Sequence, residues 1–172
     1  MDLPTDLTEL RRHIEMLTDR TAIEDTFAEY AAAMDGQDPA ALFRLFAPDI
    51  ILEHPKGGAN GRDAAVAQIS GAMSRHFTSH HMITNIRVTI DGARARAVGY
   101  FHSIHLDDPA KADQHDDHGG WYLAELVRTD RGWLIDRLKQ VSVWSAGNRQ
   151  PKEPLDPSIP DELRRHLAGG AD

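Results

Sequence analysis

Residues 78–106 read TSHHMITNIRVTIDGARARAVGYFHSIHL, and this stretch decides the class of fold. Both halves carry the period-2 alternation of β-strands, and between them lies Asp91-Gly92, a dipeptide typical of the two-residue turn of a β-hairpin. In the second half Arg94 and Arg96 alternate with small residues, so the two sets point to opposite faces of a sheet. The stretch therefore predicts two long antiparallel strands.

A second hairpin is predicted further along the chain. Residues 121–128 and 133–144 form its strands, and residues 129–132 (TDRG) form its turn. A polar segment, residues 107–120 (DDPAKADQHDDHGG), is predicted to connect the two hairpins as a long loop that ends in a turn at its two glycines.

The first part of the chain reads as helices. Apolar residues recur at i, i+4 and i+7 over residues 10–34, with a joint expected at Asp19-Arg20, and shorter helices are expected at 39–46 and 61–74. A short β-branched strand, 49–53, lies between those two. Helices followed by antiparallel strands predict an α+β fold, in which helices cross one face of a curved sheet and leave a cone with an open end. Such a mouth suits a small molecule.

Length and composition agree with one compact domain. The chain has 172 residues, and we expect residues 1–150 to form the domain and residues 151–172 to form a proline-rich tail with a short helix. There is no cysteine, which excludes disulfides and thiolate chemistry.

Charge and hydropathy limit the partners. Acidic residues number 27 against 19 lysines and arginines, so the net charge is −8 and nucleic acid is not an expected partner. No apolar run reaches the roughly 20 residues that span a membrane, and the polar N-terminus is unlike a signal peptide. We expect a cytoplasmic protein with no membrane partner.

Ten histidines stand out in this composition. His80 and His81 are adjacent on a predicted strand, so at most one of them faces a given pocket. Strict alternation puts His80 in phase with Met82 and Ile86, whereas a bulge before Ile86 would turn His81 to that face. His105 shares its face with the small residues of its strand and is expected to face inward.

Two residues near the end of the first long helix are also candidates. Tyr30 and Asp35 lie about 140° apart on an ideal helix. A carboxylate at a helix C-terminus is unfavourable because of the helix dipole, and a histidine partner would offset that cost.

A metal-dependent enzyme is one alternative, with ligands from His76, His80, His115 and His118. The spacing of His76 and His80 suits zinc only on a helix, and the pattern there is a strand, so no metal site is expected. We expect His76, His80 and His102 to lie in solvent or on outer faces, and His54, His115 and His118 to lie in loops. His13 and His166 lie in the terminal helices, which leaves His81 and His105 as candidates for chemistry.

Several landmarks fall in the order seen in one family: Asp19-Arg20-x-x-Ile23, Tyr30-x-x-x-x-Asp35, Leu45-Phe46-Ala47-Pro48-Asp49, Gly61-Arg62-Asp63, His81-x-x-x-Asn85, Asp91-Gly92-x-x-Ala95 and Thr129-Asp130-x-Gly132-Trp133. The chain resembles a SnoaL-like domain of the NTF2-like superfamily, and within it the branch of scytalone dehydratase and the bile-acid dehydratases.

The resemblance implies a cofactor-independent lyase or isomerase with an acid–base pair of Asp35 and His81. It implies that Tyr30 binds the substrate carbonyl and that His105 holds or protonates the departing hydroxyl. The small hydrophobic, ring-containing substrate would contact aromatic residues: Phe27, Phe46, Phe101 and Trp121. The resemblance also implies a homo-oligomer, a dimer or trimer. A non-catalytic module for small-molecule binding or assembly remains an alternative, because this fold serves many functions.

Overall fold

The computed structural model describes residues 6–147 and 158–168. Three helices precede or interrupt the early strands, and a fourth follows the sheet. They are α1 (Leu7–Asp35), α2 (Pro39–Leu45), α3 (Arg62–Met73) and α4 (Ile159–Ala168), with a short 3₁₀ turn, η1 (Pro109–Lys111).

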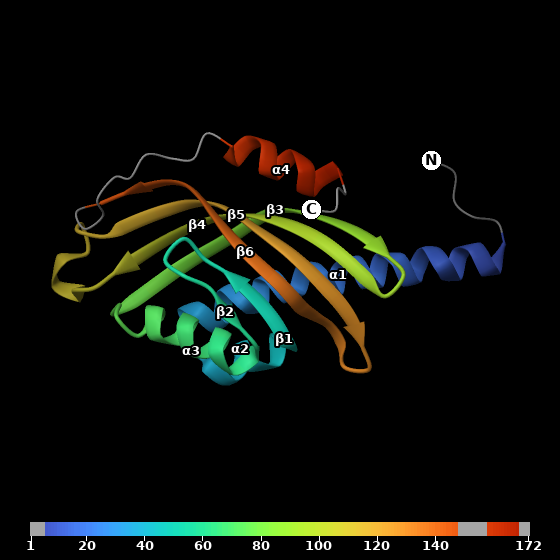
Figure 1. Ribbon diagram of the computed structural model, residues 1–172, viewed down its shortest axis with the longest axis horizontal. Helices are drawn as coiled ribbons and strands as arrows, with labels where there is room; N and C mark the ends of the chain where they lie inside the picture. Colours follow the sequence, from blue (N-terminus) through green and yellow to red (C-terminus); the bar gives the residue numbers. More distant parts are fainter. Residues whose placement is uncertain (1–5, 148–157, 169–172) are drawn as a thin grey trace.

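Six strands form one curved sheet in the order β2-β1-β6-β5-β4-β3. The pair β1 and β6 is parallel, and all other neighbours are antiparallel. The strands are β1 (Phe46–Glu53), β2 (Ala59–Asn60), β3 (Thr78–Asp91), β4 (Arg94–Leu106), β5 (Asp116–Thr129) and β6 (Gly132–Ala146). In Figure 1, α1, α2 and α3 lie on one side of this sheet and α4 on the other, which confirms the predicted α+β class.

Both predicted hairpins form. The first turns one residue later than predicted, at Gly92-Ala93, because Asp91 still pairs with Arg94, and the second turns within residues 129–132 as predicted. Gly92 and Gly132 take positive φ values of 57° and 99°, which an L side chain rarely adopts. The connection between the hairpins is shorter than predicted, because β5 begins at Asp116 and pairs with the end of β4. Gly119 and Gly120 therefore lie within a strand rather than in a turn, and the indole of Trp144 occupies the space beside Gly119.

The joint expected at Asp19-Arg20 is wrong, because α1 continues unbroken for 29 residues. Asp19 instead accepts hydrogen bonds from Arg128 and from the indole nitrogen of Trp133, so it ties the helix to the second hairpin. Arg20 pairs with Glu24 one turn further on. Polar residues in this stretch thus serve tertiary contacts without ending the helix.

The main core lies between α1, α3 and the inner face of the sheet. Phe27, Phe46 and Ile135 are almost completely buried there. Gly99 allows close packing, because a Cβ at this position would lie 3.2 Å from the Phe27 ring. Burial of apolar area of this kind stabilises the fold by about 25 cal/mol per Å².

The outer face of the sheet is not fully open. Val98, Leu123 and Val141 form a second cluster there, against which Ile159 and Leu163 of α4 pack, and α4 lies over this face in Figure 1. None of the helices in the described part of the chain has the length and apolarity to span a lipid bilayer.

Candidate active site

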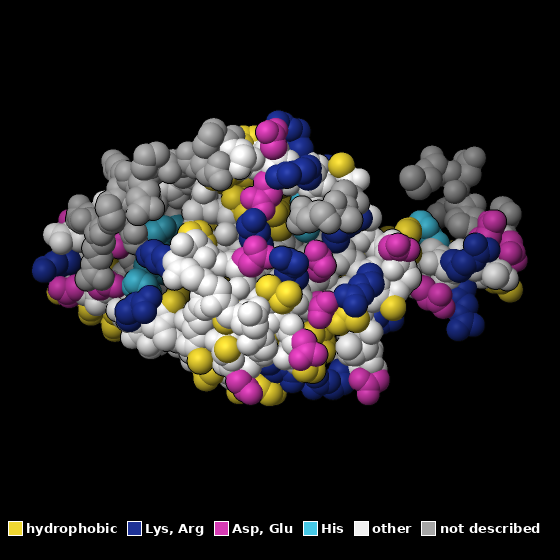
Figure 2. All heavy atoms as spheres, viewed as in Figure 1, with side chains coloured by type: hydrophobic (Ala, Val, Ile, Leu, Met, Phe, Trp, Pro, Cys, Tyr) yellow, Lys and Arg dark blue, Asp and Glu magenta, His cyan; other side chains and the backbone are white. Residues whose placement is uncertain are grey.

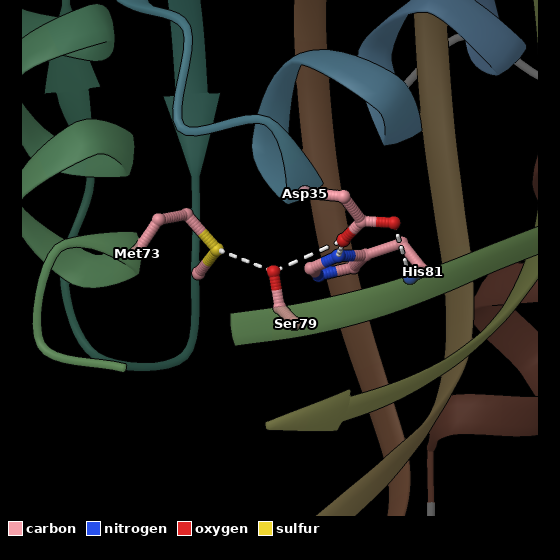
Figure 3. A network of polar contacts seen from close by, with 4 residues as sticks. All are labelled: Asp35, Met73, Ser79 and His81. Atoms are coloured by element: carbon pink, nitrogen blue, oxygen red, sulfur yellow. Dashed lines mark hydrogen bonds and ion pairs between the residues drawn. The ribbon is translucent and has the colours of Figure 1, made fainter. Parts of the chain in front are cut away.

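Asp35 and His81 are in direct contact at the end of α1. Asp35 Oδ1 lies 2.7 Å from His81 Nδ1, and Asp35 Oδ2 accepts the backbone N–H of the same residue at 2.9 Å. Ser79 also donates its hydroxyl to Asp35 Oδ1 at 3.0 Å (Figure 3). The carboxylate therefore holds both the ring and the backbone of His81.

A β-bulge turns His81 toward the helix. The β3–β4 register shifts between Thr84 and Arg87, and Asn85 takes a left-handed φ of 52°. Residues before the bulge therefore have the opposite phase from those after it, so His81 faces the core in the same way as Ile86 does. The bulge predicted as the alternative to strict alternation is confirmed.

Asp35 is ionised in this environment. Burial raises the pKa of its carboxyl, but the hydrogen bonds from His81 and Ser79 outweigh burial and hold that pKa below its usual value. An ionised carboxylate only accepts hydrogen bonds, so the proton of a neutral His81 ring lies on Nδ1. Nε2 then keeps its lone pair for a substrate.

His105 lies next to this pair, as expected. Its ring centroid is 5.4 Å from that of His81 and 5.2 Å from that of His118, and it stacks on His76 at 4.5 Å with only 11° between the planes. Figure 2 shows histidines exposed toward the end of the molecule where β4 and β5 are connected. Four histidines thus gather at one end of the sheet.

This cluster corrects two predictions. His76 is not a solvent-facing residue, because its side chain is 17% exposed and its Nδ1 lies 2.7 Å from Asp107 Oδ1. His118 is not in a loop, because it lies on β5 opposite Ser103 of β4. His118 was missed because the polar segment before residue 120 has the composition of a loop but pairs as a strand. His76 was missed because its partners, Asp107 and His105, are distant in sequence.

The cluster keeps His105 uncharged. Burial, followed by the nearby His81, His76, His118 and Lys56, lowers the pKa of His105 to about 3. Its Nε2 atom is buried and has no hydrogen-bond partner in the described part of the chain. A neutral imidazole with an unused nitrogen can hydrogen-bond a substrate.

Tyr30 lies one turn before Asp35 and is buried. Its ring meets that of Tyr122 edge to face at 5.5 Å, and Tyr122 in turn packs on Phe101 at 4.7 Å. Burial raises the pKa of the Tyr30 hydroxyl. Burial, with Tyr30 and Asp35 nearby, also raises the pKa of Tyr122. Both phenols therefore stay protonated as donors.

The predicted aromatic lining divides between the two faces of the sheet. Phe27, Phe46 and Phe101 are buried in the inner core. Trp121 is wrong as a lining residue, because it packs against the outer cluster beneath α4. Its neighbour Tyr122 takes the inner position.

Sequence reasoning also missed Ser79. A serine next to two histidines carries no distinctive signal, although its spacing of two from His81 places both on one strand face.

The residues considered as metal ligands do not form a site. Among the described residues, no three histidine, aspartate or glutamate side chains are arranged to hold a metal ion. His76 is engaged with Asp107, and His80 is exposed on the other face of β3.

A family model described as the SnoaL-like domain matches residues 15–139. The chain belongs to the SnoaL-like domain family. An uncharacterized protein of Mycobacterium tuberculosis is 30% identical to this SnoaL-like chain over 125 residues, which cover 70% of the chain and 83% of the relative.

Solved structures share the fold of this SnoaL-like chain. A proposed scytalone dehydratase from Novosphingobium aromaticivorans has a TM-score of 0.71 at 22% identity, with 82% of this chain and 95% of that one covered. An NTF2-like protein from the same species has a TM-score of 0.68 at 23% identity, with coverages of 86% and 94%. The hexachlorocyclohexane dehydrochlorinase LinA-type3 from Novosphingobium barchaimii has a TM-score of 0.69 at 16% identity, with coverages of 84% and 99%. The fold is that of the NTF2-like proteins.

Proposed function

We propose that this SnoaL-like protein is a cofactor-independent lyase or isomerase, and that Asp35 and His81 are its acid–base pair. The observation that carries the proposal is the double contact of one carboxylate with the ring and the backbone of a buried histidine. Such a carboxylate fixes the tautomer of the imidazole and stabilises the imidazolium that forms during the reaction.

His81 Nε2 takes a proton from a carbon next to a carbonyl group or on an electron-poor ring. As the electron pair of that C–H bond forms a double bond, the bond to a hydroxyl on the adjacent carbon breaks. His81 returns its proton to the departing hydroxide, and water leaves. If no hydroxyl leaves and His81 returns the proton to another carbon of the delocalised anion, the reaction is an isomerisation. General-base catalysis of this kind contributes about 10²–10⁴-fold.

Two further residues act on the oxygens of the substrate. Tyr30 is a protonated phenol and donates a hydrogen bond to the carbonyl or the developing enolate. His105 is uncharged and holds the departing hydroxyl through its unused Nε2. We propose hydrogen bonding for His105, because its low pKa makes it a poor carrier of an acidic proton at neutral pH.

The substrate class follows from the side chains around the pair. Phe101 and Tyr122 pack together beside Tyr30, and Phe27 and Phe46 lie deeper in the core. A small hydrophobic substrate, with a ring and one carbonyl or hydroxyl group, suits these surroundings. Two structural neighbours are named as a dehydratase and a dehydrochlorinase, and both names describe eliminations.

The non-catalytic module is the weaker reading. A binding module gains nothing from a carboxylate that orients a histidine, and a wide separation of Asp35 and His81 would have favoured it. Their 2.7 Å contact favours the enzyme.

A panel of β-hydroxy carbonyl compounds tests the proposal. Each compound is incubated with the protein in deuterated water, and mass spectrometry follows loss of water and uptake of deuterium. We expect at least one ring-containing compound to react, and His81→Ala to abolish the reaction. His80→Ala is the matched control, because His80 is exposed on the opposite face of the strand. Equal activity of both variants would refute the assignment.

We also propose that the chain forms a homo-oligomer. The beginning of α1 extends beyond the sheet in Figure 1, and its Leu7, Ile14 and Leu17 are exposed. Light scattering at micromolar concentration should give the mass of a dimer or trimer, and Ile14→Glu should lower that mass. A monomer mass for the unaltered protein would exclude this proposal.

A further inference from the structure

The edge of the sheet at β3 carries a feature that the proposed reaction does not use. A cavity of about 170 Å³ lies between α1, β3, β4 and the last turn of α4, and three arginines line it, Arg20, Arg87 and Arg96. One water needs only about 15 Å³ of such space. The cavity therefore has room for a polyatomic ligand.

The cavity is separate from the Asp35–His81 pair. Beyond the bulge in β3, Arg87 and Thr89 point away from the core, whereas Val88 packs against it. Arg96 lies on β4 directly opposite Thr89, on the same outer face. Two guanidinium groups and one hydroxyl thus share one patch of two neighbouring strands.

Arg87 and Arg96 have no carboxylate partner within the described residues. Arg20 is paired with Glu24 at 2.8 Å. Glu125 lies opposite Arg96 on β5, but no ion pair forms between them in the described part of the chain.

The acidic side chains of α4 are also engaged elsewhere. Glu162 pairs with Lys139, and Asp161 pairs with Arg164. The remaining titratable group of the lining is His166, near the end of α4. In a chain with a net charge of −8, two arginines that pair with no carboxylate of the described residues are an unusual local excess of positive charge beside one cavity.

We propose that this cavity binds a phosphate-type oxyanion, either inorganic phosphate or the phosphate group of a small phosphomonoester. Each guanidinium presents a rigid fork of N–H donors that matches two oxygens of one anion. A phosphate has enough oxygens for both Arg87 and Arg96 and for the hydroxyl of Thr89, whereas a single carboxylate has only two. Arg20 adds positive charge at the rim.

Titration calorimetry on the full chain at constant ionic strength tests the site with three probes: inorganic phosphate, glycerol 3-phosphate and malonate. We expect phosphate or its ester to bind, and to bind at least tenfold more weakly to the double variant Arg87→Gln/Arg96→Gln. Arg94→Gln is the matched control, since Arg94 lies on the same strand face but pairs with Asp136 at 2.7 Å. It should bind as the unaltered protein does.

The probes also separate the two sources of the ligand. Tighter binding of the ester indicates a phosphorylated metabolite, and equal binding indicates free phosphate. Absence of binding, equal binding by the double variant, or equally tight binding of malonate would overturn the proposal. If the double variant fails to fold, the side-chain Nε–H signals of Arg87 and Arg96 in the unaltered protein decide, because bound phosphate must shift both. Activity is not measured, so the result is independent of the proposed reaction.

Discussion

Asp35 binds His81 at two points, with one oxygen 2.7 Å from the ring Nδ1 and the other accepting the backbone N–H at 2.9 Å. The two contacts fix the position of the strand and the orientation of the ring together. The carboxylate lies at the C-terminus of α1, where the helix dipole disfavours negative charge. The three donors from β3 compensate for that cost.

Replacing Asp35 with Asn should reduce turnover of a responsive substrate by about 10²–10⁴-fold while the fold is retained. The amide oxygen must take the place of Oδ2, because the backbone N–H of His81 can only donate. The amide NH₂ then faces His81 Nδ1 and forces the proton to Nε2. Steady-state kinetics and circular dichroism measure the two effects. Near-normal turnover would show that the carboxylate is structural only.

The bulge at Asn85 should be sensitive to side-chain shape. A left-handed conformation costs most L residues about 1–2 kcal/mol, and a β-branched residue is among the least suited to it. We expect Asn85→Val to lower the free energy of unfolding by about that amount and Asn85→Gly to leave it nearly unchanged. Urea denaturation compares the two, and equal stability would mean that the bulge is not strained.

The contact between Asp19 and the second hairpin should make stability depend on pH. Hydrogen bonds from Arg128 lower the pKa of Asp19 against the effect of burial, and Trp133 adds to the lowering. Because the pKa is lower in the folded state, the contribution is present above the unfolded value near 3.8 and disappears as the pH falls through the folded value.

Accordingly, Asp19→Asn should cost about 1 kcal/mol at pH 7, an amount limited by the partial exposure of Arg128. Below both pKa values the difference from the unaltered protein should vanish. Denaturant titrations at a series of pH values test this, and a cost that persists undiminished in acid would contradict it.

Two glycines should respond oppositely to alanine. A Cβ at Gly120 would collide with the backbone carbonyl of Val141, so Gly120→Ala should destabilise the protein by about 3 kcal/mol. No atom of residues 6–147 or 158–168 lies within 4 Å of the corresponding position at Gly71 in α3, so Gly71→Ala should stabilise it by about 0.5 kcal/mol. Thermal unfolding of the two variants provides the check, and a shift in the same direction would be inconsistent with this packing.

Local signals predicted much of the fold. Asp91-Gly92 and the alternation around it predict β3 and β4, and the apolar spacing before Gly36 predicts α1. The polar start of β5 was not predictable in this way. His118 pairs as part of a strand because β4 offers a partner opposite it, and that pairing is invisible in the local composition.

The contact between Asp35 and a histidine was predicted, because a carboxylate at a helix C-terminus needs a cationic or N–H partner. The resemblance to the family chose His81 over His80, and the bulge in β3 turns His81 toward Asp35. The choice of Trp121 over Tyr122 failed for a different reason. The phase of β5 depends on its register with β4, where Tyr122 lies opposite Gly99 on the core face.

The tautomer of His81 tests the central claim most directly and needs no substrate. A long-range ¹H–¹⁵N correlation spectrum of the uniformly labelled protein, at a pH where the ring is neutral, reports which ring nitrogen carries the proton. We predict that Nδ1 is protonated and Nε2 is not, and that Asp35→Asn reverses this assignment. A proton on Nε2 in the unaltered protein would contradict the role of His81 as the base oriented by Asp35.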